Sequence, residues 1–229
     1  MKSVEHEAGG VGIRSLAFRS PWLWLLLAAL AVVSVIGFRG ADLAIAAQVR
    51  QWMAAYPESG WWLAAHWVGK SGTLAICALI TLILWVRAGW FRPDPRLWRN
   101  CLWVLAAESA NGVAGFILKL VMGRWRPNQP QAGAFEFLQR YNPKCQSFPS
   151  GHTADVAAVA TVLWFVYPRL RPLYVAWVVV MAAARIGEMR HFLSDTAVGA
   201  MLGILCACVV QQHLRRLEGW IWSRWRVRP

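Results

Sequence analysis

Long apolar runs alternate with short polar segments along this chain, and the runs have the length of membrane-spanning helices. A helix needs about 20 residues to cross a hydrocarbon core of about 30 Å. This pattern predicts an all-α fold, a polytopic membrane protein whose six transmembrane helices form one bundle with interfacial helices beside it. The predicted spans are residues 21–38, 71–91, 100–120, 151–168, 172–190 and 195–213.

Two polar segments interrupt this pattern. Residues 40–70 contain apolar runs that are too short to cross a bilayer, so we expect one or two interfacial helices there. Residues 122–149 are rich in Pro and show little periodicity, which indicates an ordered loop. No internal repeat or linker divides the chain, so residues 1–229 are expected to form a single domain.

The composition supports a membrane protein. The chain is 58% hydrophobic and 15% charged, and its 16 Trp lie mostly beside apolar runs, where indole rings prefer the interface. The formal net charge of +13 suggests nucleic acid in a soluble protein, but here Lys and Arg flank apolar runs and suit anionic headgroups. We therefore expect the membrane as partner, with no nucleic acid and no obligate protein partner.

The distribution of basic residues predicts the orientation. Outside the motifs described next, most Lys and Arg fall in segments on the same side as the N-terminus. Cytoplasmic loops carry such an excess, so both termini are expected in the cytoplasm. The first apolar run has no convincing small-residue cleavage site and is expected to stay as an anchor.

Three short motifs follow one another at the ends of predicted spans. They are K-x6-R-P (Lys119, Arg126, Pro127), P-S-G-H (Pro149, Ser150, Gly151, His152) and R-x5-H-x3-D (Arg185, His191, Asp195). Because successive helices run in opposite directions, these motifs are all expected at one membrane face. That face would be outside the cytoplasm, toward the periplasm if the protein sits in a bacterial inner membrane.

The residue types in the motifs indicate phosphate chemistry. Lys119, Arg126 and Arg185 are cations without an acidic cluster that could hold a metal, and such a set suits a small dianion such as phosphate. Ser150 and Gly151 start a helix, where free N–H groups favour an anion. Ser150 is equally compatible with a simple helix N-cap.

The two histidines can supply a nucleophile and a proton. His191 and Asp195 are four residues apart, so in a helix they would share a face, and the carboxylate could hold one ring nitrogen while the other attacks phosphorus. His152 would then be the general acid.

Together these motifs resemble the three motifs of the type 2 phosphatidic acid phosphatase superfamily, and the layout is similar to that of its integral membrane lipid phosphatases. The resemblance implies that Lys119, Arg126 and Arg185 bind phosphate with Ser150 and Gly151. It further implies a phospho-histidine on His191, protonation of the leaving alcohol by His152, orientation of His191 by Asp195, and no metal or other cofactor. Ala184 stands where the family usually has Ser, which predicts a modest change in phosphate affinity.

Other polar side chains lie within the predicted spans. Glu108 and Asn111 continue one helix face toward Lys119, and they could line a substrate groove or make hydrogen bonds between helices. Asp155 could support the ring of His152 or simply favour the start of its helix.

The sequence thus predicts a membrane lipid phosphatase that hydrolyses a phosphate monoester or pyrophosphate through a phospho-histidine. The candidate substrates are undecaprenyl pyrophosphate, phosphatidylglycerol phosphate, phosphatidic acid and lipid A. Two alternatives stay open: a lipid phosphotransferase with the same intermediate, and a non-catalytic lipid transporter that grips headgroups with the same cations.

Overall fold

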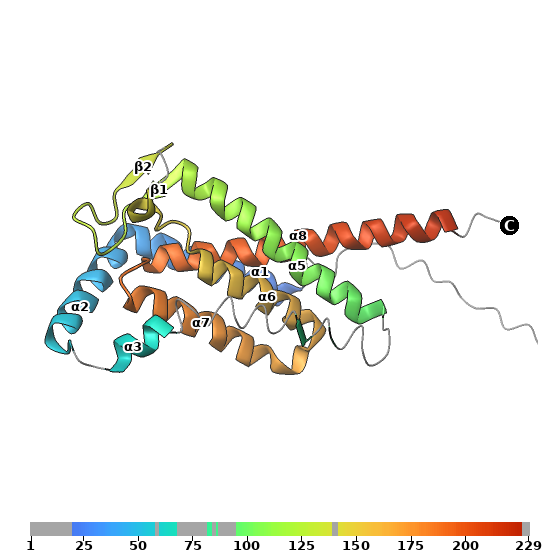
Figure 1. Ribbon diagram of the computed structural model, residues 1–229, viewed down its shortest axis with the longest axis horizontal. Coiled ribbons are helices and arrows are strands. Elements are labelled where there is room, and N and C mark those ends of the chain that lie inside the picture. Colours follow the sequence, from blue (N-terminus) through green and yellow to red (C-terminus); the bar gives the residue numbers. More distant parts are fainter. Residues whose placement is uncertain are drawn as a thin grey trace, which may run out of the picture.

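The computed structural model describes residues 20–57, 60–67, 82–83, 86, 95–138 and 142–225, and long helices dominate this part of the chain (Figure 1). The helices are α1 (Pro21–Ile36), α2 (Asp42–Ala55), α3 (Gly60–Trp67), α5 (Pro95–Val121), α6 (Gly151–Val166), α7 (Arg171–Gly187) and α8 (Leu193–Trp225). A π-helical turn (Gly37–Ala41) and two 3-10 turns (Pro143–Cys145 and Pro168–Leu170) connect some of them.

Helices occupy the predicted spans at 21–38, 100–120, 151–168, 172–190 and 195–213. Four described segments are long and apolar enough to cross a membrane: Pro21–Ala55, Arg99–Val121, Pro168–Gly187 and Leu193–Leu217. Helix α6 is apolar but has 16 residues, which at 1.5 Å per residue is shorter than a full crossing. The predicted span at 71–91 lies almost entirely outside the described residues.

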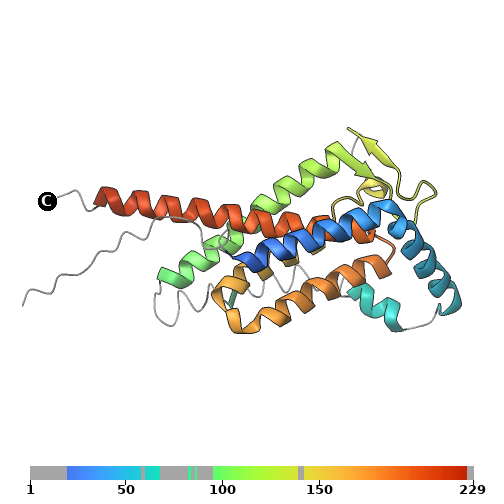
Figure 2. The same cartoon turned by 180° about the vertical axis from the view of Figure 1, so that it is seen from behind.

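The chain turns sharply between α1 and α2. Gly40 has a φ of 133°, a conformation that residues with a side chain rarely adopt, and it lies in the π-helical turn. Helix α2 therefore leaves the direction of α1 and lies across one end of the bundle, as both views show (Figures 1 and 2). Trp52 on α2 and Tyr56 just after it are largely exposed.

Helices α6 and α8 pack with their backbones in close contact. A Cβ atom added at Gly199 would overlap the carbonyl oxygen of Ser150, and one at Gly203 would overlap that of Ala154. Small residues let membrane helices approach closely enough for extensive van der Waals contact. The two glycines therefore hold the start of α6 against the start of α8.

One buried cluster joins α5, α6, α7 and α8. It contains Trp103, Val104, Val159, Val162 and Ala207, all nearly inaccessible. The indole N–H of Trp103 donates to the backbone carbonyl of Ala207 at 2.7 Å, which satisfies the polar atom of this large side chain.

The segment after α5 contains a short hairpin that the all-α prediction did not include. Strand β1 (Met122–Arg124) pairs antiparallel with β2 (Phe135–Phe137), and Arg124 lies opposite Phe135. Strands of three residues are too short to give a periodic signal in the sequence. The hairpin lies at the same end of the bundle as α2 (Figure 1).

Candidate active site

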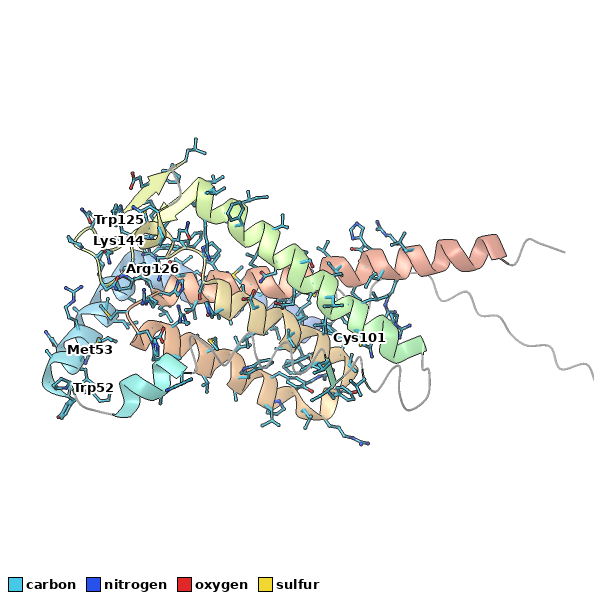
Figure 3. The ribbon with its side chains drawn as sticks, in the orientation of Figure 1. Trp52, Met53, Cys101, Trp125, Arg126 and Lys144 are labelled. Carbon is cyan, nitrogen blue, oxygen red and sulfur yellow. The ribbon has the colours of Figure 1, made fainter. Side chains whose placement is uncertain are left out.

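The three motifs meet at the end of the bundle that α2 and the hairpin cover. Helices α5 and α7 end there, and α6 and α8 begin there (Figures 1 and 2). Arg126 follows β1, and Figure 3 places it at this end of the molecule, near Trp125 and Lys144. The backbone N–H of Arg126 donates to the carbonyl of Lys144 at 3.1 Å, which fixes the loop that carries it.

The cations of the site lie close enough to act on one another. Burial is the main factor that lowers the pKa of Arg126 to about 10, and the positive charges of Arg190 and Arg185 lower it further. Arg126 stays protonated at neutral pH despite this shift. Its buried Nε has no hydrogen-bond partner among the described residues. An anion between these side chains would relieve their repulsion.

Arg185 is held by an acidic neighbour. Its Nη1 donates to Oε2 of Glu188 at 2.5 Å, and Oε1 of Glu188 lies 3.5 Å from Nδ1 of His66 on α3. Both Arg185 and Glu188 are largely buried. Glu188 thus fixes the direction of the guanidinium beside the other cations.

The start of α6 is open to an anion. Ser150 occupies the N-cap position, but its side chain makes no capping bond and instead lies 3.0 Å from the hydroxyl of Thr153. Gly151 follows, and a Cβ there would lie 3.2 Å from Nζ of Lys119. Ser150 therefore holds the predicted N-cap position without a capping bond from its side chain, and Nζ of Lys119 lies close to Gly151, the first residue of α6.

His191 is almost fully buried, and one of its ring nitrogens has a backbone partner. Nδ1 lies 2.6 Å from the carbonyl oxygen of Ser147. Because a carbonyl oxygen only accepts, Nδ1 must carry the proton, and the neutral ring keeps its lone pair on Nε2. Burial, followed by the positive charges of Arg185 and Arg126, holds the pKa of His191 well below its ordinary value, so the ring is neutral at pH 7.

His152 is the second residue of α6 and is half-buried. The charges of Arg185, Lys119 and Arg126 all act on its ring, which places His152 beside the same three cations as His191. The structure therefore gathers every predicted cation and both predicted histidines at one site.

The predicted hydrogen bond between Asp195 and the ring of His191 is wrong. Oδ1 of Asp195 accepts from Arg124 at 2.6 Å, and Oδ2 accepts from the Ser147 hydroxyl at 2.5 Å and from the Phe192 N–H at 2.8 Å. The helical spacing does not apply, because α8 begins at Leu193 and His191 precedes it. Asp195 caps the helix through the Phe192 N–H, and Ser147 connects its carboxylate to the ring of His191.

Sequence reasoning missed a buried network next to His191, formed by Asp42, Arg124, Ser147 and Ser194 together with Asp195. The guanidinium of Arg124 packs against the rings of Phe38, Phe135 and Phe192 at 4.1–5.2 Å from their centroids. The available signal was Arg124 itself, a charged residue inside the K-x6-R-P motif, in a strand too short to recognise from the sequence.

Asn111 joins two helices. Its Nδ2 donates to Oδ1 of Asp155 at 2.7 Å between α5 and α6, and the residue is 2% exposed. This contact favours the interhelical interpretation of Asn111 and gives Asp155 a partner other than His152. Glu108 has one buried carboxylate oxygen without a hydrogen-bond partner among the described residues.

Known proteins resemble this chain in sequence. Lipid A 1-phosphatases of Rhizobium etli and Rhizobium johnstonii are each 30% identical over 95 residues, which is 41% of this chain. The matched segment covers 41% and 39% of those two proteins, so the chain matches about two-fifths of their length.

Two crystal structures resemble the fold. Aquifex aeolicus LpxE is 23% identical with a TM-score of 0.50, covering 65% of this chain and 82% of that one. A transmembrane PAP2-type phosphatidylglycerolphosphate phosphatase from Bacillus subtilis is 17% identical with a TM-score of 0.54, covering 90% and 98%. The apolar helices and this shared fold make the chain an integral membrane protein.

The family model described as the PAP2 superfamily matches residues 97–218. This range includes all three motifs, from Lys119 to Asp195, and more than half of the chain. The chain belongs to the PAP2 superfamily.

Proposed function

We propose that this protein is a lipid phosphatase that hydrolyses a phosphate monoester or pyrophosphate through a phospho-histidine on His191, without a metal ion. One observation carries the proposal: His191 is buried and neutral, its Nδ1 is fixed by the Ser147 carbonyl, and its Nε2 is left as a nucleophile beside three cations. Family membership supports the same chemistry.

The residues of the site suit both halves of the reaction. Nε2 of His191 attacks phosphorus while the bond from phosphorus to the lipid oxygen breaks, and His152, which must hold a proton at this step, gives that oxygen the proton. His152, now neutral, takes a proton from water as the water oxygen attacks the phospho-histidine, which releases phosphate and restores His191. Lys119, Arg126, Arg185 and the N–H groups at the start of α6 would stabilise the charge on the phosphoryl oxygens.

The surroundings of the site suit a lipid that remains in the bilayer. On α5, in the two turns before Lys119, Val113, Phe116 and Ile117 are more than half exposed, so this part of the helix presents apolar side chains to the bilayer near the site. Lipid A is the first substrate to test because two relatives are named lipid A 1-phosphatases. Phosphatidylglycerol phosphate, undecaprenyl pyrophosphate and phosphatidic acid follow.

The proposed location is a bacterial inner membrane with both termini in the cytoplasm and the site facing the periplasm. The excess of Lys and Arg on the side of the N-terminus supports this orientation. Alkaline phosphatase fused after Gln131 should be active, whereas a fusion after Arg171 should be inactive. The reverse pattern would contradict the orientation.

Phosphate release tests the activity. The purified protein in detergent should release inorganic phosphate from one of these lipids in the presence of EDTA, and His191→Ala should abolish the release. His213→Ala is the matched control, because His213 is exposed on α8 and bonds only to the backbone of Val209 among the described residues. Release by the His191→Ala variant at the wild-type rate would refute the mechanism.

A further inference from the structure

We propose that Asp42 and Arg124 are positioning residues for the nucleophile, acting on His191 through Asp195 and Ser147. This inference rests on the proposed function, since it assigns a role in the reaction of His191. The network joins four separate parts of the chain: α2, β1, the loop before α6 and the start of α8.

Ser147 is the residue of this network that contacts His191 directly. Its carbonyl accepts from Nδ1 of His191, and its hydroxyl donates to Oδ2 of Asp195 at 2.5 Å. Ser147 is fully buried, with an exposure of 0%. The direction of its carbonyl, and therefore of the His191 ring, depends on where the carboxylate of Asp195 lies.

Arg124 fixes that carboxylate. Its Nη1 donates to Asp195 at 2.6 Å and to the Ser194 hydroxyl at 2.8 Å, while its Nη2 donates to Asp42 at 2.8 Å. The three ions are nearly inaccessible, with side-chain exposures of 5% for Arg124, 2% for Asp42 and 0% for Asp195. A buried pair of this kind is strongly perturbed when one partner is removed, because the remaining charge is left uncompensated.

Asp42 anchors the far end of the network. It accepts from Arg124 and from both the N–H and the hydroxyl of Ser194, at 3.0 and 2.5 Å. The space for this contact depends on Gly37, where a Cβ would lie 2.6 Å from Oδ1 of Asp42 and 2.8 Å from the Cβ of Ser194. The turn between α1 and α2 is thus shaped to bring Asp42 against α8.

Substitutions that disturb Asp42 should therefore lower turnover without weakening phosphate binding. Within the part of the chain that the structure describes, Asp42 makes no hydrogen bond to Lys119, Arg126 or Arg185. Displacing the His191 ring by about 1 Å can reduce the rate about 100-fold, since attack needs close alignment. A purely structural role would instead lower the thermal stability and leave the turnover of the folded protein unchanged.

The test compares Asp42→Asn, Gly37→Ala and Ser194→Ala with the wild type, using the lipid that the wild type hydrolyses. Asp42→Asn and Gly37→Ala should lower kcat by about 10-fold to 100-fold while KM changes by less than about threefold. Rapid mixing followed by an alkaline quench should show that phospho-histidine forms more slowly by the same factor. Ser194→Ala, which removes one hydroxyl, should show a smaller loss of the same kind.

Gly112→Ala and Trp103→Phe are the controls. A Cβ at Gly112 meets nothing within 4 Å, and Trp103 bonds to Ala207 away from the site, so both variants should keep the wild-type kcat. Wild-type kcat in folded Asp42→Asn and Gly37→Ala, or a raised KM with unchanged kcat, would overturn the inference. If neither variant folds, wild-type kcat in Ser194→Ala overturns it. An inactive wild type would instead overturn the proposed function.

Discussion

Replacing Gly203 by Ala should weaken both the helix packing and the activity. The added Cβ would overlap the carbonyl oxygen of Ala154 and would lie 2.8 Å from the backbone nitrogen of Ala158. These are backbone atoms of α6, so α6 and α8 must separate by about 1 Å to restore an ordinary contact. Overpacking of this kind costs about 1–3 kcal/mol.

The separation would also reach the active site, because His152 lies two residues before Ala154 at the start of α6. A displacement of about 1 Å in the active site costs about 100-fold in rate. For a protein of this size, a loss of 1–3 kcal/mol lowers Tm by about 2–12 °C. Both effects should appear together in Gly203→Ala.

Thermal unfolding in detergent and phosphate release measure these two effects. Gly112→Ala is the matched control, since a Cβ there meets nothing within 4 Å and Ala favours a helix interior over Gly by about 0.5–1 kcal/mol. Its Tm should be equal to or above that of the wild type. If Gly203→Ala has the Tm and kcat of the wild type, the close contact between α6 and α8 is not as described.

Three further predictions follow from the site. The pKa of His191 in the fold lies below its ordinary value of 6.5, so the unfolded chain binds a proton first as pH falls. This group should therefore leave Tm unchanged above about pH 6.5 and lower Tm below it. The decrease of Tm with falling pH should be smaller in His191→Gln. Orthovanadate at about 100 times its Kd should stabilise the wild type by about 2.7 kcal/mol, and Arg126→Gln should lose most of this gain; equal stabilisation of both proteins would count against the phosphate site. Asn111→Leu should lower Tm and leave KM for the lipid unchanged, because it removes the bond to Asp155; a raised KM at constant Tm would support the substrate groove instead.

The helices and the location of the site were predictable because their signals are local. Apolar runs predict helices from composition alone, and alternating helix directions bring Lys119, His152 and His191 to one end of the bundle. Helix α6 is shorter than its predicted span because Pro168 begins a 3-10 turn before α7.

The buried contacts around His191 were not predictable because they are not local. Arg124 and Asp42 are 82 residues apart in the chain, and no spacing rule pairs them. The rule that placed Asp195 against His191 holds only within a helix, and α8 starts between these two residues. Ser147 acts through its backbone carbonyl, which leaves no signature in the side-chain sequence.

Trapping the phosphorylated residue tests the central claim most directly. The purified wild type is mixed with a lipid substrate that carries radiolabelled phosphate, quenched in alkali, and digested for peptide mapping. We predict that the label is acid-labile and alkali-stable, that it maps to His191, and that it disappears in His191→Ala. Label on another residue, or hydrolysis by His191→Ala at the wild-type rate, would contradict the mechanism.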